Sequence, residues 1–239
     1  MASARNADQN ALLAALPSKE QKRILGYLKP AALSLGDILC EPGKTIERIY
    51  FPLTALISLL TVVDDKPLEV GMIGREGVLG IPLAFGVKHS PVRALVQGAG
   101  LALTMPTPVF LREFKRSPPL QGKVLGFANE LMLQIGLSAA CNRFHPVTAR
   151  LARWLLMTRD RVGSDEFRLT HKFLADMLGV RRAGVTIAAS GLQRGGVIEY
   201  SWGRVRILNE RKLEATACSC YEMGRGIYKR EQSRANRNP

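Results

Sequence analysis

The chain has 239 residues, of which 46% are apolar. This length suits two modest domains, and this composition argues against general disorder. The formal net charge of +14 is unevenly distributed along the chain. Residues 1–119 hold 14 of the 34 basic and 10 of the 20 acidic side chains, a net charge of +4, and residues 120–239 hold the remaining 20 basic and 10 acidic side chains, a net charge of +10. A basic half beside a nearly balanced half indicates contact with a polyanion, although charge alone does not separate DNA from RNA or an anionic membrane.

The targeting and redox features of the chain favour the cytoplasm. No stretch approaches the roughly 20 apolar residues that span a bilayer, and the first twenty residues lack the long apolar run of a signal peptide. Four cysteines, at positions 40, 141, 218 and 220, do not suggest a disulfide framework at this length. We therefore expect a cytoplasmic protein with reduced thiols and no membrane partner.

The first half of the chain has the pattern of a small β domain. After a short amino-terminal helix, brief β-rich runs separated by turn signals continue from about residue 32 to residue 104. Strands of this length with frequent turns predict an antiparallel barrel or jelly roll.

A long helix is predicted from about Leu120 to Ala140, after the break at Ser117-Pro118-Pro119. Its apolar residues recur at intervals of three and four, which gives one apolar stripe. The stripe has two interpretations: packing against the chain's own β domain, or a two-helix seam between two copies of the chain. We predict the seam, with these dimer-helix residues: Val124, Phe127, Ala128, Leu131 and Ile135.

The segment from Leu169 to Tyr200 predicts a helix-turn-helix. Thr170 is a suitable N-cap for a first helix that ends near Leu178, and Gly179 supplies the positive φ of a tight turn. A second helix is expected from about Arg182 to Gln193. Its inward positions would be Val185, Ala188, Ala189 and Leu192. In this motif the amino-terminal part of the second helix meets base edges, so the predicted base contacts are Arg181, Arg182, Ala183 and Thr186.

Two short β-like runs follow, Val197–Tyr200 and Val205–Leu208, joined by a turn at residues 201–204. This pair predicts a wing beside the helices. Phosphate contacts are predicted for a polar set on the helices and the wing: Thr170, His171, Lys172, Ser190, Arg204 and Arg206. Each of these alone is equally well explained as a solvated surface residue, but as a set they favour phosphate binding.

At this point the chain resembles the Crp/Fnr family of bacterial transcription regulators. The similarity covers roughly Ala11 to Tyr221 and is most specific in LTHKFLADMLGVRRAGVTIAASGLQRGGVI, in the hinge SAACNRFHPVTARLARWLL and in EVGMIGREGVLGIPLAFG. It implies an α+β chain: an antiparallel β-roll of the cyclic-nucleotide-binding type, a long dimerisation helix and a winged helix-turn-helix. It further implies a homodimer on a two-fold symmetric operator in double-stranded DNA, with RNA polymerase as a partner.

The resemblance also shows where this chain departs from well-known members. The ribose-binding carboxylate of cyclic-AMP-responsive members is absent, because the matching glycine, Gly80, is followed by Ile81. Arg93, which follows Val92, remains a candidate phosphate ligand. The candidate effector pocket therefore consists of Gly80, Ile81, Val92 and Arg93. Its effector would be a small molecule other than cyclic AMP, or the protein would have no effector. One cysteine in the first half cannot hold an iron–sulfur cluster.

Other chemistry is weakly supported by the sequence. A β-roll enzyme would need clustered ligands, whereas His89, His145 and His171 are scattered. Cys218 and Cys220 lack nearby partners in the sequence, so we predict inert thiols, no metal, no cofactor and no enzymatic activity. The alternative to a specific regulator is a DNA-binding protein of the nucleoid-associated kind, with no sequence preference and no effector.

The expected domain organisation has four parts. Residues 1–117 would form the sensory β-roll, 118–145 the dimerisation helix and hinge, and 146–222 the winged helix-turn-helix domain. Residues 223–239 would form a basic, disordered tail that adds non-specific attraction to DNA.

Overall fold

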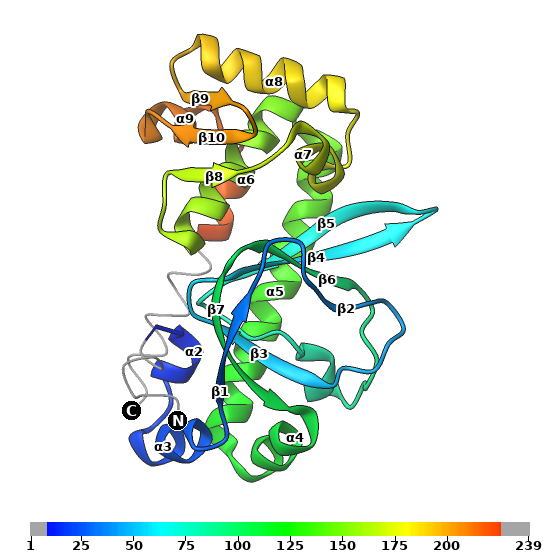
Figure 1. Cartoon of the computed structure of the whole chain (residues 1–239), viewed down its shortest axis with the longest axis vertical. Coiled ribbons are helices and arrows are strands. Elements are labelled where there is room, and N and C mark those ends of the chain that lie inside the picture. The colour runs from blue at the N-terminus through cyan, green and yellow to red at the C-terminus, as the bar shows by residue number, and fades with distance from the viewer. Residues whose placement is uncertain (1–8, 226–239) are drawn as a thin grey trace. The chain divides into compact units, whose positions relative to one another are not determined.

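A computed structural model describes residues 9–225 of the chain (Figure 1). The described residues divide into two compact units. The first consists of residues up to 59 together with 71–133, and the second of residues 60–70 together with 134–225. This division falls inside the long helix, whereas the pattern of the sequence suggested boundaries at its two ends.

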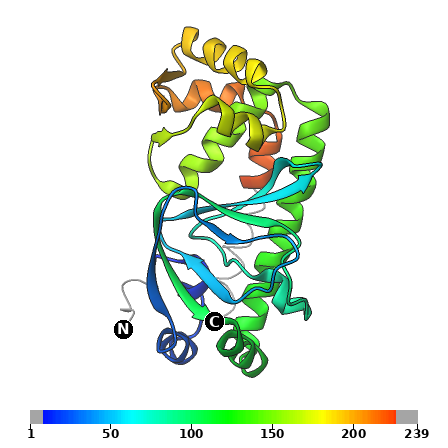
Figure 2. The same cartoon turned by 45° about the vertical axis from the view of Figure 1, so that its right-hand side comes forward.

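The first unit is built on two sheets, one three-stranded in the order β1-β7-β3 and one four-stranded in the order β2-β6-β4-β5. The end of β4 and the start of β5, within residues 60–70, are counted with the second unit. Figures 1 and 2 show these strands wrapping around a common interior, as the short strands and frequent turns of the sequence predicted. The strands are β1 (Lys29–Leu33), β2 (Ile38–Cys40), β3 (Arg48–Pro52), β4 (Leu56–Val63), β5 (Lys66–Ile73), β6 (Arg93–Gly98) and β7 (Gly100–Pro106).

The antiparallel strand β7 organises the three-stranded sheet. It pairs with β1 on one side, with Lys29 opposite Thr104, and with β3 on the other, with Phe51 opposite Leu103. Ile49, Phe51 and Leu103 are fully buried, so this register turns the apolar side chains of both strands into the roll.

Short helices accompany the roll: α2 (Ala11–Ala14), α3 (Ser18–Leu25), the 3-10 helix η1 (Ile81–Phe85) and α4 (Thr107–Arg116). Asn10 connects the amino-terminal helix to the sheets. Its side-chain oxygen accepts a hydrogen bond from Leu13 N at 3.1 Å, and its amide donates to the carbonyl oxygens of Pro52 and Gly77 at 2.9 and 3.0 Å. The Asn10 side chain is fully buried, and these hydrogen bonds pair both of its N–H groups and its oxygen, which ties α2 to the sheets.

The long helix α5 (Pro118–Phe144) is longer at both ends than the sequence predicted. It extends through most of the expected hinge and stops before Pro146, because a residue that precedes proline avoids the helical conformation. By length and composition α5 is apolar enough to cross a membrane, contrary to the sequence-based expectation that no stretch comes close.

The apolar stripe predicted on α5 lies inside the single chain. Val124, Phe127, Ala128 and Leu131 are all buried, and only Ile135 of the predicted set is exposed. A Cβ on Gly77 would lie 2.0 Å from Cζ of Phe127, which shows how closely the helix packs on the roll. These four side chains therefore have almost no surface left to offer a second chain.

The second unit contains the carboxyl-terminal elements (Figure 1). They are α6 (Val147–Val162), β8 (Glu166–Arg168), α7 (His171–Leu178), α8 (Arg182–Arg194), β9 (Ile198–Ser201), β10 (Arg204–Ile207) and α9 (Glu210–Thr216). Leu151, Leu155 and Leu156 of α6 are buried and form the centre of this unit. Residues 220–225 are helical, so the tail predicted from residue 223 starts too early, and its remainder, 226–239, lies outside the described residues.

Candidate nucleic-acid interface

The candidate interface begins with the tight turn between α7 and α8. The Thr170 side chain caps α7 by accepting a hydrogen bond from Phe173 N at 3.1 Å, as predicted. Gly179 ends the helix in the left-handed conformation, with φ +61°, and its N–H donates to Ala175 O. Only glycine adopts this conformation without a steric cost, so the chain reverses here and α8 starts within three residues.

Helix α8 has one buried and one exposed face. Val185, Ala188, Ala189 and Leu192 are buried, and these are the four inward positions that the sequence predicted. Two of them are alanines, whose small side chains let α8 lie close to its neighbours. The opposite face is exposed within the described part of the chain.

The predicted base-contacting residues share the exposed face at the amino-terminal end of α8. Arg181 is the N-cap residue, Arg182 is the first helical residue, and both are exposed together with Ala183 and Thr186. The exposed face also includes Ile187, whose side chain is 72% exposed and which the sequence reasoning did not select. An apolar side chain at this position offers contact with thymine methyl groups.

Thr186 and His171 join the two helices at this end. The Thr186 hydroxyl lies 3.0 Å from His171 Nδ1 and donates to Arg182 O at 3.1 Å. The His171 ring also stacks on Tyr200 of the wing, with centroids 4.5 Å apart and an angle of 8° between the planes. Tyr200 in turn donates its hydroxyl proton to Leu169 O at 2.7 Å. The amino-terminal end of α8, where the base contacts are predicted, is therefore held in place by α7 and the wing.

This arrangement changes the electrostatic character expected of His171. Burial lowers its pKa below the usual value, and the nearby Arg182 guanidinium lowers it further. The imidazole is therefore neutral at pH 7. Its role as a phosphate contact stays a prediction, but the attraction would come from a neutral ring and not from a cation.

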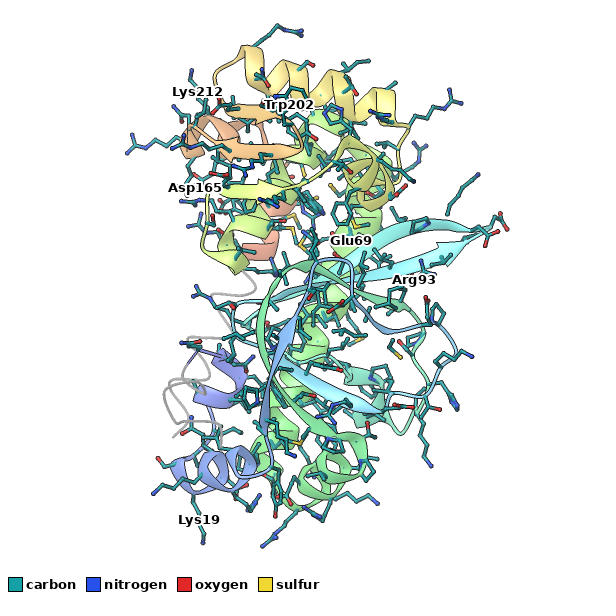
Figure 3. All side chains as sticks on the ribbon, in the orientation of Figure 1. Lys19, Glu69, Arg93, Asp165, Trp202 and Lys212 are labelled. Atoms are coloured by element: carbon teal, nitrogen blue, oxygen red, sulfur yellow. The ribbon has the colours of Figure 1, made fainter. Side chains whose placement is uncertain are left out.

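The wing is a three-stranded antiparallel sheet in the order β8-β10-β9. The sequence indicated β9 and β10 to within one residue but missed β8, which is three residues long. Trp202 and Gly203 form the two-residue turn of the hairpin, with φ +51° and +74°, the dihedral signs of a type I′ turn. The Trp202 side chain, labelled in Figure 3, is 100% exposed, and the sequence reasoning gave it no role.

The remaining predicted phosphate contacts are exposed on the same unit. Ser190, Lys172, Arg204 and Arg206 are all accessible. The Lys172 ammonium pairs with Asp176 at 3.2 Å on α7, and Arg204 lies 3.6 Å from a Glu166 oxygen. Exposed ion pairs of this kind contribute little to stability, so both cations can exchange their partners for phosphate at low cost.

The candidate effector residues lie in the first unit, where they have local structural roles. Gly80 has φ +122°, and a Cβ there would lie 2.3 Å from Ile49 Cδ1. Ile81 begins η1 and is buried. The Arg93 guanidinium, labelled in Figure 3, pairs with Glu41 at 2.8 Å, so its charge is already balanced by a carboxylate of the same roll.

Comparisons with known proteins agree with this geometry. A family model for the Crp-like helix-turn-helix domain matches residues 149–216. No curated protein matches the sequence. The structure is similar to FixK2 from Bradyrhizobium japonicum, with a TM-score of 0.68, 12% identity and coverage of 80% of this chain and 98% of that one.

Two further solved structures are similar over most of the chain. The c-di-GMP-responsive global regulator CLP of Xanthomonas campestris has a TM-score of 0.67 and 16% identity, with 81% of this chain and 100% of that chain covered. A CRP-family transcriptional regulator from Thermus thermophilus has a TM-score of 0.66 and 18% identity, with 78% and 96% covered. At these identities the likeness shows a shared fold. The predicted resemblance is therefore confirmed: residues 149–216 form a Crp-like helix-turn-helix domain, and the chain has the α+β fold of Crp/Fnr transcription regulators.

Proposed function

We propose that this protein is a sequence-specific DNA-binding transcription regulator that inserts α8 into the major groove. The observation that carries the proposal is the exposed amino-terminal end of α8, where Arg181, Arg182, Ala183 and Thr186 lie on the face opposite the buried one. Arginine at this position can form a bidentate pair with guanine O6 and N7. The exposed cations of α7 and the wing would fix the register by contacting phosphates.

We place the dimer contact on a stripe of α5 that is offset from the predicted one. The exposed positions recur at alternating intervals of three and four residues, which is the spacing of a two-helix seam. They are Gly122, Leu125, Asn129, Met132, Gly136 and Ala139. Added Cβ atoms at Gly122 and Gly136 would meet no atom within 4 Å, so the glycines leave room for a second helix. An apolar helix face that avoids water in this way also accounts for the high apolar content of α5.

The β-roll is proposed to lack the standard recognition of cyclic AMP. Gly80 is followed by the buried Ile81, which offers no carboxylate for the ribose hydroxyl groups, and Arg93 is paired with Glu41. The effector is then a different small molecule or is absent. A contact with RNA polymerase follows from the family resemblance and stays a prediction.

Selection of bound fragments from random DNA with the full chain tests the proposal. We expect a two-fold symmetric motif and an affinity for selected DNA at least about 10³-fold higher than for random DNA at matched salt. Equal affinity for the two would contradict a regulator and would indicate the non-specific, nucleoid-associated alternative. Repeating the selection with a small-molecule extract of cells would report any dependence on an effector.

A further inference from the structure

The fold brings together three cysteines and one histidine that lie far apart in the sequence. Cys141 is in the last turn of α5, His145 follows one helical turn later, and Cys218 and Cys220 follow α9. Their ligand atoms all lie within 4.8 Å of one another. The Sγ atoms of Cys141 and Cys218 are 3.4 Å apart, and Cys220 Sγ lies 3.6 Å from His145 Nδ1.

The two short distances are close to the edges of a tetrahedron around one metal ion. Zinc binds thiolate sulfur at about 2.3 Å and imidazole nitrogen at about 2.0–2.1 Å, so tetrahedral ligands are separated by about 3.8 Å for sulfur–sulfur and about 3.6 Å for sulfur–nitrogen pairs. A maximum separation of 4.8 Å leaves space for a single ion at the centre. The three cysteines are buried and the histidine is half-buried, so the ligands are also shielded from water.

The charges next to the cluster provide a second, independent observation. Arg150 and Arg153 of α6 are both buried, and the Nε of each has no hydrogen-bond partner within the described part of the chain. Nη2 of Arg150 donates to Asn142 Oδ1 at 2.6 Å and to Leu178 O, and Nη2 of Arg153 lies 3.4 Å from Ser138 Oγ. These partners carry no charge, whereas a buried cation needs a compensating anion. Three thiolates and one neutral histidine around a divalent ion carry a net charge of −1, which would partly balance these arginines.

The four ligands are held where they are by neighbouring contacts. Tyr221 is buried and donates its hydroxyl proton to Asp160 of α6 at 3.0 Å, which holds the segment of Cys218 and Cys220 against α6. Ala149, at the start of the same helix, packs against the three thiols. The ligands are therefore preorganised by the fold of the second unit.

We propose that Cys141, His145, Cys218 and Cys220 form a Cys₃His site for one divalent metal ion of the zinc type. Four protein ligands fill a tetrahedral shell and leave no open position, so the ion would be structural. It would join the end of α5 to the segment after α9 and stabilise the second unit. Thiolate and imidazole ligands favour zinc over magnesium, calcium or manganese.

The test measures the metal in the full-length protein, purified with a thiol reductant and without chelator. We expect one zinc ion per chain by inductively coupled plasma mass spectrometry. After removal of the zinc, titration with Co²⁺ should give the intense visible bands of tetrahedral thiolate coordination, with an endpoint at one equivalent. Both measurements use the unmodified chain, so they do not depend on a variant that folds poorly.

Variants then assign the site. Cys218→Ser and His145→Asn should lower zinc affinity at least 100-fold in competition with a chelating dye, and circular dichroism would show whether they remain folded. Cys40→Ser is the matched control, because Cys40 lies in β2, outside the cluster, and should keep one zinc per chain.

Three results would overturn the proposal. The first is a metal content near zero, together with a cobalt spectrum of octahedral type. The second is a Cys141–Cys218 disulfide that forms in the purified protein and persists in the reductant, because it would consume two of the ligands. The third is full zinc retention in the Cys218 variant. None of these measurements involves DNA, so their outcome is separate from that of the proposed regulator function.

Discussion

Replacement of Arg182 by alanine distinguishes base recognition from simple charge attraction. Arg182 is exposed at the first position of α8, where alanine is at least as favourable for a helix, so the free energy of unfolding should change by less than about 0.5 kcal/mol. A bidentate arginine–guanine pair contributes about 1–3 kcal/mol of discrimination. The preference for the selected operator half-site should therefore fall roughly 5-fold to 150-fold, since 1.4 kcal/mol corresponds to about tenfold.

The assay is a set of binding titrations with the selected operator, with operators altered at single positions and with random DNA, at several salt concentrations. Arg206→Ala is the matched control, because Arg206 is exposed on β10 of the wing and is predicted to contact phosphate. It should weaken binding to all sequences equally and reduce the salt slope by about one. If Arg182→Ala produced this same uniform loss, the assignment of Arg182 to base recognition would be refuted.

Three further predictions concern the dimer, pH and the turn. Met132→Glu should dissociate the dimer in analytical ultracentrifugation, because it puts a charge in the exposed stripe of α5. Val63→Glu is the control, because Val63 is exposed but lies outside α5, and this variant should stay dimeric. Equal sedimentation of the two variants would place the seam elsewhere. Since the pKa of His171 is lower in the folded state, the unfolded chain binds more protons below about pH 6.5 and stability should decrease with falling pH. Thermal melts of His171→Asn over the same pH range should show a weaker decrease than those of the unmodified protein. An equal decrease in the two proteins would contradict this assignment. Gly179→Ala should cost about 1–2 kcal/mol in denaturant unfolding because φ is +61°, and an unchanged midpoint would mean that the turn had rearranged.

Local patterns predicted the parts of this protein whose structure depends on neighbours in the sequence. The two helices around Gly179 and the four inward positions of α8 were predicted because helical periodicity and a glycine turn act over three or four residues. The β-roll was predicted as a class from its short strands and turns. Strand β8 was missed, because three residues are too few to give a pattern.

Periodicity also identified an apolar stripe on α5 but did not decide what covers it. Val124 and Leu131 have the spacing of a dimer seam, yet they are buried by the chain's own roll, and the exposed stripe through Leu125 and Met132 lies beside them. An apolar repeat of three and four residues forms whether the helix packs on its own β-roll or on a second copy of the helix. Only the packing of segments distant in the sequence decides between these two arrangements.

The sequence by itself predicted the helix-turn-helix and the class of the β-roll, because both depend on local patterns of apolar residues and turns. Only the tertiary structure decided the surroundings of the thiols. Cys218 and Cys220 look isolated in the sequence, and their partners Cys141 and His145 lie more than 70 residues away. A ligand set depends on where side chains meet in space, and the helix packing that brings these four together has no local signature.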